Sequence, residues 1–188
     1  DNIVDELLSF GIDVITTGNH AWDKRETFEY IKKQRRLLRP FNLSSDAPGN
    51  GFGIYESIGG YKVGVLNLMG NVFMKKCDDV FVKSKQFLEQ NTLKKKYDFL
   101  VVDFHAEITS EKMAIGHVFD GHATFVVGTH THVPTNDGRL LKKGTAYLTD
   151  AGMCGDYNSV IGMNTLNSLN RFYKKESVKH YPAEGEAS

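Results

Sequence analysis

Residues 97–132 read YDFLVVDFHAEITSEKMAIGHVFDGHATFVVGTHTH and alternate apolar runs with a helical pattern. The first apolar run, residues 97–104, is short and rich in Val and Phe, as buried strands are. A helical pattern over residues 110–119 follows, and a second apolar run covers residues 123–129. A strand, a helix and a second strand in this order predict an α/β domain.

The same alternation continues on both sides of this unit. We expect helices up to Gly11 and over about residues 24–35, 82–95 and 164–174, and strands near residues 13–17 and 145–150. IYESI and KVGVLNL flank Gly59-Gly60, which predicts a β-hairpin. The hairpin makes the predicted sheets mixed, not purely parallel.

The composition is that of an ordinary globular protein, with 40% hydrophobic and 24% charged residues. The 23 basic and 23 acidic residues balance, which argues against a broad nucleic-acid surface or attraction to an anionic membrane. Cys77 and Cys154 stand far apart, which fits a reducing compartment. No apolar run approaches the roughly 18 residues of a membrane span. We therefore expect a cytoplasmic protein without a membrane partner, and a homo-oligomeric state is left open.

Four histidines fall just past the predicted carboxyl ends of three strands. They are His20, His105, His130 and His132. In open α/β sheets this edge is where ligands bind. His130 and His132 have i, i+2 spacing, which in an extended segment directs both imidazoles to one side. Two other interpretations are possible. His130 and His132 could be surface residues of a loop, and His105 could be a buried histidine whose hydrogen bonds are satisfied within the protein. The placement of histidines at the ends of three strands, all at the same edge, favours a metal site.

Asn19 precedes His20 at the first of these strand ends. An Asn carbonyl oxygen is a neutral, hard ligand, so it can complete a metal site without adding a negative charge that repels phosphate. The pair could also be a simple turn, since Asn after Gly is common there. Asp23 could hydrogen-bond to His20 and orient it. Its spacing to Glu26 equally predicts a capping box for the following helix, and we favour that interpretation.

Three blocks, GNHAWD (18–23), DFHAEITSEK (103–112) and GTHTHVPT (128–135), resemble the metal and catalytic blocks of calcineurin-like metallophosphoesterases. The sequence is most similar to the small bacterial YmdB-type branch, a group of 2′,3′-cyclic-nucleotide phosphodiesterases. RPFN, PGNGFGIY and KGTAYLTDAGM extend this resemblance over essentially the whole chain.

The resemblance implies a four-layer α-β-β-α sandwich and two divalent metal ions, with Fe or Mn expected and Zn as the alternative. Asn19, His105 and His130 would bind one metal, and His132 would bind the other. A metal-bound hydroxide would attack phosphorus in line, and His20 would be the general acid that protonates the leaving oxygen. The implied substrate is a small phosphodiester, such as a 2′,3′-cyclic nucleotide.

The family pattern begins with strands that carry an Asp ligand and a bridging Glu, and these blocks are absent here. We therefore expect residues 1–188 to be a single metallophosphoesterase domain that lacks the first strands and a C-terminal segment. Two other functions remain as alternatives. One is a nucleotide-binding regulatory protein that is catalytically incomplete. The other is an amidohydrolase-type metal hydrolase, which also uses a His-x-His pair at a strand end.

Overall fold

The computed structural model describes residues 2–92, 94–174 and 179–187, and its largest element is a six-stranded mixed sheet with strand order β3-β4-β5-β6-β8-β7. The strands are β3 (Phe52–Glu56), β4 (Lys62–Met69), β5 (Phe99–His105), β6 (Phe125–Thr129), β7 (Arg139–Leu140) and β8 (Ala146–Leu148). β4, β5, β6 and β8 are parallel, whereas β3 and β7 are antiparallel edge strands. The predicted hairpin and the mixed α/β class are both confirmed.

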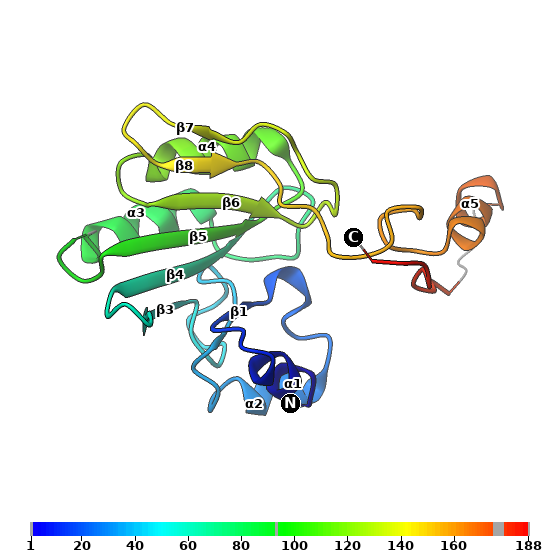
Figure 1. Cartoon of the computed structure of the whole chain (residues 1–188), viewed down its shortest axis with the longest axis horizontal. Coiled ribbons are helices and arrows are strands. Elements are labelled where there is room, and N and C mark those ends of the chain that lie inside the picture. The colour runs from blue at the N-terminus through cyan, green and yellow to red at the C-terminus, as the bar shows by residue number, and fades with distance from the viewer. Residues whose placement is uncertain (1, 93, 175–178, 188) are drawn as a thin grey trace.

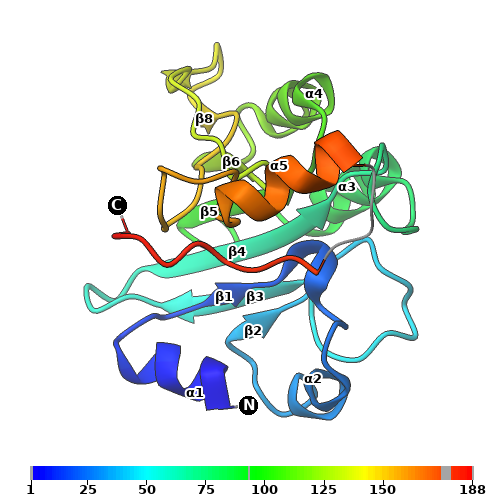
Figure 2. The same ribbon diagram turned by 90° about the vertical axis from the view of Figure 1, so that its right-hand side faces the viewer.

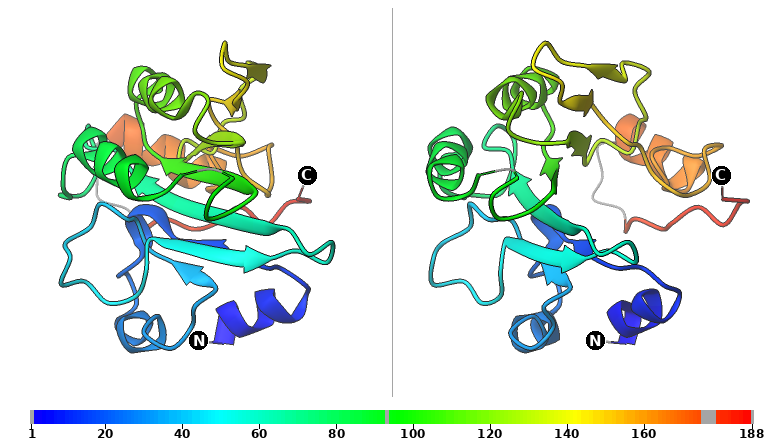
Figure 3. Two further views of the ribbon diagram at one scale, coloured as in Figure 1. Left: turned by 90° about the vertical axis from the view of Figure 1, so that its left-hand side faces the viewer. Right: turned by 60° about the vertical axis from the view of Figure 1, so that its left-hand side comes forward.

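A second, two-stranded sheet pairs β1 (Ile15–Thr16) in parallel with β2 (Leu37–Leu38). Figures 1 and 3 show α3 (Val80–Gln90) and α4 (Thr109–Phe119) on one face of the large sheet. The small sheet lies on the other side, with α1 (Asn2–Ser9) and α2 (Arg25–Tyr30) beyond it, as Figure 2 also shows. The layers thus follow the expected order of helix, sheet, sheet and helix, although the second sheet has two strands in the described part of the chain.

The core lies between the large sheet and its two covering helices. Alternate residues of β5, namely Leu100, Val102 and Phe104, are completely buried and pack in one cluster with Ile115 and Phe119 of α4. Burial of each such side chain contributes about 1.5–3 kcal/mol. Because successive side chains of a strand point to opposite faces, the intervening residues of β5 face the small sheet.

Asn67 of β4 connects the two sheets. Its amide is completely buried. Its Oδ1 atom accepts a hydrogen bond from the Gly18 N–H at 3.4 Å, and its Nδ2 atom donates to Asp103 Oδ2 of β5 at 3.1 Å. One side chain therefore bonds both to the segment after β1 and to the strand that carries His105.

Several element boundaries differ from the expected ones. The helix expected over residues 24–35 ends at Tyr30, because the chain turns there so that Leu37 and Leu38 can pair with β1. The helix expected over residues 82–95 begins at Val80, where the Asp79 carboxylate accepts from two backbone N–H groups, and it ends at Gln90. β2 and β7 were not predicted, since two-residue strands carry no periodicity.

α5 (Thr165–Lys174) stands beyond the carboxyl ends of the large sheet's strands, as Figure 1 shows. The helix expected over residues 164–174 is thereby confirmed. Across the residues that the structure describes, the helices are too short or too polar to cross a bilayer.

Candidate functional site

The predicted blocks meet at the carboxyl edge of the large sheet. β5 ends at His105, and the register of the parallel strands sets His105 beside Thr129 at the end of β6. His130 follows at once. The third block comes from the other sheet, where a single 3-10 turn, Gly18–His20, follows β1 and carries Asn19. Strand register and layer packing thus bring residues 19, 105 and 130 together.

Three potential ligand atoms converge there. His105 Nε2 lies 2.7 Å from Asn19 Oδ1 and 3.1 Å from His130 Nδ1. The two imidazole rings meet edge to face, with centroids 4.8 Å apart. Such separations are those of neighbouring ligands around a common centre, given metal–ligand bonds of about 2.0–2.2 Å.

The opposite ring nitrogens of both histidines are bound to acceptors. The Thr129 hydroxyl donates to Asp103 Oδ1 at 2.7 Å, so it is left to accept from His105 Nδ1 at 3.0 Å. His130 Nε2 lies 3.1 Å from Glu107 Oε2, and a carboxylate only accepts. In the tautomers that donate through these outer nitrogens, His105 Nε2 and His130 Nδ1 keep their lone pairs for a ligand. This is how ligand histidines are usually oriented.

Burial disfavours the charged form of both rings. Burial, reinforced by the neighbouring His130, lowers the pKa of His105 to about 3. Burial also lowers the pKa of His130, although the Glu107 carboxylate opposes this effect. With their N–H groups on the outer nitrogens, the two imidazoles and the amide oxygen can present three lone pairs to one cation. The donor set fits Mn, Fe or Zn alike.

His132 is not part of this network. Its Nδ1 atom donates to the Ile161 carbonyl at 2.8 Å, which leaves Nε2 with the lone pair. Among the described residues, no three His, Cys, Asp or Glu side chains form a group that could hold a metal ion. The structure thus assembles three of the four predicted ligands, two imidazoles and one amide, and keeps the fourth separate.

His20 is exposed and its orientation is fixed by Asp23. His20 Nδ1 lies 2.5 Å from Asp23 Oδ2, and Lys75 Nζ lies 2.9 Å from the other carboxylate oxygen. Hydrogen bonds from Lys75 and then from His20 lower the pKa of Asp23. The capping interpretation of Asp23 was wrong: α2 has Lys24 at its N-cap position and no side-chain cap. The carboxylate bonds to His20 instead, which is the contact expected of an orienting residue.

Gly18 packs directly against the ring of His105. It has φ +61°, and a Cβ atom at this position would lie 2.4 Å from His105 Cγ. A glycine is therefore required both for the left-handed turn and for the close approach to the imidazole.

A cavity of about 500 Å³ has His132 in its wall. Its remaining lining is mostly apolar and comprises Val133, Pro134, Met153, Tyr157, Ser159, Val160 and Ile161. The Tyr157 hydroxyl donates to the Met153 carbonyl at 2.8 Å and accepts from the Met153 N–H at 3.2 Å, which fixes the ring. The cavity lies at the same strand edge as the histidines and could receive an apolar, planar group.

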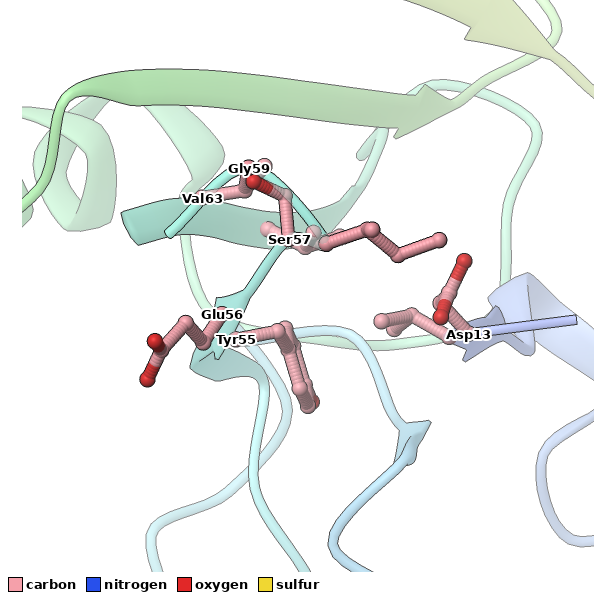
Figure 4. A pocket seen from close by; sticks show the side chains of 9 residues that line it. Asp13, Tyr55, Glu56, Ser57, Gly59 and Val63 are labelled. Atoms are coloured by element: carbon pink, nitrogen blue, oxygen red, sulfur yellow. The ribbon is translucent and has the colours of Figure 1, made fainter. Parts of the chain in front are cut away.

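A larger cavity, about 670 Å³, lies between residues 13–14, which directly precede β1, and the β3–β4 hairpin. Figure 4 shows Asp13 on one side of it and Tyr55, Ser57 and Val63 on the other. None of the predicted site residues lines this cavity. Its size alone therefore does not make it the functional site, and the histidine cluster carries the chemistry.

Sequence reasoning missed the acceptors that orient the histidines. Thr129 and Glu107 lie 24 and 23 residues from the rings they bind, and Lys75 lies 52 residues from Asp23. No local pattern marks such pairs. Only their positions in the sequence could have indicated a role for Thr129 and Glu107, because both stand within two residues of predicted ligands at the ends of β6 and β5.

Two solved structures resemble this chain closely. A protein from Thermus thermophilus, described as hypothetical, superimposes with a TM-score of 0.88 and 41% identity over 96% of this chain and 69% of that one. A novel phosphatase from Mycoplasma pneumoniae gives a TM-score of 0.87 and 35% identity over 98% of this chain and 66% of that one.

A Bacillus subtilis (strain 168) protein named 2′,3′-cyclic-nucleotide 2′-phosphodiesterase is 43% identical over 188 residues, which are all of this chain and 70% of the relative. The chain thus spans about two thirds of the length of these relatives. The family model described as YmdB-like protein matches residues 1–188. The expected resemblance is confirmed, and the chain belongs to the YmdB-like protein family.

Proposed function

We propose that this chain is a metal-dependent phosphodiesterase that hydrolyses small phosphodiesters, with 2′,3′-cyclic nucleotides as the substrate class. The observation that carries the proposal is the convergence of Asn19 Oδ1, His105 Nε2 and His130 Nδ1 within hydrogen-bonding distance of one another. The name of the Bacillus relative supports the substrate class.

Asn19, His105 and His130 would hold one divalent cation, and His132 would contribute to a second. Such cations, when bound, neutralise the charge that develops on the phosphoryl oxygens and make water more acidic. A neutral amide in the ligand set keeps the site attractive to an anionic diester. Fe or Mn is our preferred pair of candidates, with Zn as the alternative.

His20 would donate a proton from Nε2 to the leaving oxygen. Asp23 accepts from Nδ1 and therefore keeps the opposite nitrogen directed outward. The side chain of His20 is 68% exposed, so a substrate can reach it. The cavity beside His132 would accommodate the base of the nucleotide, with Tyr157 as the aromatic wall.

We also propose a cytoplasmic site of action, because Cys77 and Cys154 are both free thiols.

The test is hydrolysis of bis(p-nitrophenyl) phosphate and 2′,3′-cyclic AMP by the 188-residue chain after anaerobic loading with Mn²⁺. His20→Ala should abolish turnover but leave Mn²⁺ binding unchanged. His117→Ala is the matched control, because this histidine is exposed on α4 away from the strand edge. Undiminished turnover in His20→Ala would refute the acid role.

The same assay separates the alternative functions. Saturable cyclic-nucleotide binding without turnover would favour a regulatory protein. The incomplete group of ligands in the described residues is the observation that keeps this alternative open. Hydrolysis of a lactone or amide, with none of either diester, would favour an amidohydrolase-type enzyme.

A further inference from the structure

A completely buried ion pair lies beneath the segment that carries His130 and His132. Lys112 of α4 and Asp150, which follows β8, have side chains that are 0% and 1% exposed, and Nζ lies 2.5 Å from Oδ2. Removing two charges from water costs several kcal/mol per ion, and apolar residues often replace such a pair without loss of stability. Stability alone therefore gives no reason for these charges at this place.

The other contacts of Asp150 suggest what the carboxylate does. Its Oδ2 atom also accepts from the Thr131 N–H at 3.2 Å, and its Oδ1 atom accepts from the Gly152 N–H at 2.8 Å. Thr131 is the residue between the two histidines. The carboxylate thus binds the backbone at the midpoint of the His130–His132 segment.

This segment has an unfavourable backbone conformation on both sides of Thr131. His130 has φ +105° and His132 has φ +65°, values that residues with a Cβ atom rarely adopt. Such a conformation is energetically costly and persists only where the surroundings impose it. The Thr131–Asp150 hydrogen bond is one of the contacts that impose it.

The end of β6 and the segment that follows β8 pack closely against each other. A Cβ atom on Gly128 of β6 would lie 1.7 Å from the Thr149 carbonyl oxygen, and the Ala151 N–H donates to the Gly128 carbonyl at 2.9 Å. The chain before the histidines is therefore fixed against the chain that carries Asp150. A displacement of Asp150 would be passed directly to Thr131.

We infer that Asp150, neutralised by Lys112, is a positioning residue that holds the backbone of Thr131 and thereby orients His130 and His132 for metal binding. The ligand role of the two histidines rests on the proposed function. The claim that Asp150 fixes the backbone between the two histidines does not depend on the proposed function. Asp150 touches neither substrate nor metal in this scheme.

Two double variants test the inference. Lys112→Met with Asp150→Asn removes both charges but keeps one oxygen that can accept from the Thr131 N–H. Lys112→Met with Asp150→Leu keeps none. We expect the Leu variant to bind Mn²⁺ about 10- to 100-fold more weakly than the wild type, as losses of orienting partners do, and the Asn variant to recover most of the affinity.

Ile115→Val is the control, because it removes one methylene from the buried core of the same helix without touching the segment. It should leave Mn²⁺ affinity, measured by titration calorimetry, unchanged. A folded Leu variant with wild-type affinity would overturn the inference.

A measurement on the metal-free wild type covers the case in which the variants do not fold. In ¹⁵N-labelled protein the Thr131 amide should exchange slowly with solvent, and exchange at the rate of an unstructured peptide would overturn the inference. A wild type that binds no Mn²⁺ would refute the proposed function, whereas protection of the Thr131 amide reports separately on whether Asp150 holds this segment.

Discussion

Replacing Gly18 with alanine should displace the central ligand of the predicted metal site. The new Cβ atom would lie 2.4 Å from His105 Cγ, whereas ordinary contacts begin at 3.4 Å. The imidazole or the turn must therefore move by about 1 Å. A misplacement of this size can lower turnover about 100-fold. The φ of +61° adds a backbone cost of about 1–2 kcal/mol for any residue with a Cβ atom.

The assay compares kcat for bis(p-nitrophenyl) phosphate, Mn²⁺ affinity and urea unfolding in Gly18→Ala and in Gly60→Ala. Gly60 has φ +76° and no atom within 4 Å of a Cβ position, so it carries a similar backbone cost without the collision. We expect Gly60→Ala to lose about 1–2 kcal/mol of stability and Gly18→Ala to lose more because of the collision, and only Gly18→Ala to lose turnover and metal affinity.

Equal activity in the two variants would refute the reasoning. It would mean that His105 Nε2 need not occupy its observed position for catalysis, and the ligand assignment would then be wrong. A loss of activity in Gly18→Ala with unchanged Mn²⁺ affinity would instead assign the effect to the neighbouring His20.

Three further predictions concern single side chains. Asp23→Asn weakens the orientation of His20, so kcat should fall about 10- to 100-fold at unchanged Mn²⁺ affinity, and an unchanged kcat would contradict the orienting role. Tyr157→Ala should raise KM for 2′,3′-cyclic AMP about tenfold, because stacking on a base contributes about 1–3 kcal/mol, and equal effects on methyl p-nitrophenyl phosphate would exclude a base site. Burial raises the pKa of Asp137, but threonine hydroxyls, the Thr149 N–H and an arginine more than offset this, and the pKa lies well below its usual value. The ionised Asp137 therefore stabilises the fold above about pH 4, and this stabilisation is lost as the pH falls through the folded-state pKa. In urea unfolding, Asp137→Asn should be less stable than the wild type by about 1–2 kcal/mol at pH 7, and the difference should be smaller at pH 3.

The sequence predicted the helices and strands whose apolar residues form a clear run or a regular pattern. The apolar runs before His105 and His130 identified β5 and β6, and parallel register then determined that their ends meet. Boundaries were less accurate wherever tertiary contacts override local preference. The helix after Asp23 stops early because the chain must return to pair with β1.

In the candidate site, too, some residues could be predicted from the sequence and others could not. Asn19, His105 and His130 could be placed at one edge because each stands at or near the end of a strand, and the family resemblance assigned them to one metal. The residues that hydrogen-bond to the site could not be assigned in this way. Lys75, which binds Asp23, lies in a loop that no sequence pattern connects to it. His132 was grouped with the others by i, i+2 spacing, which assumes extended backbone. The positive φ of both histidines breaks that assumption and directs them apart.

The bridge that Asn67 forms between the sheets has a thermodynamic consequence. The small sheet delivers Asn19 and the large sheet delivers His105, so a cation bound by both exists only when the two layers are docked. Anything that binds the docked form alone stabilises it by RT ln(1 + [L]/Kd), which is about 2.7 kcal/mol at a hundredfold excess over Kd. If the proposed cation binds, its occupancy should therefore stabilise the contact between the two layers, and a chelator should weaken that contact.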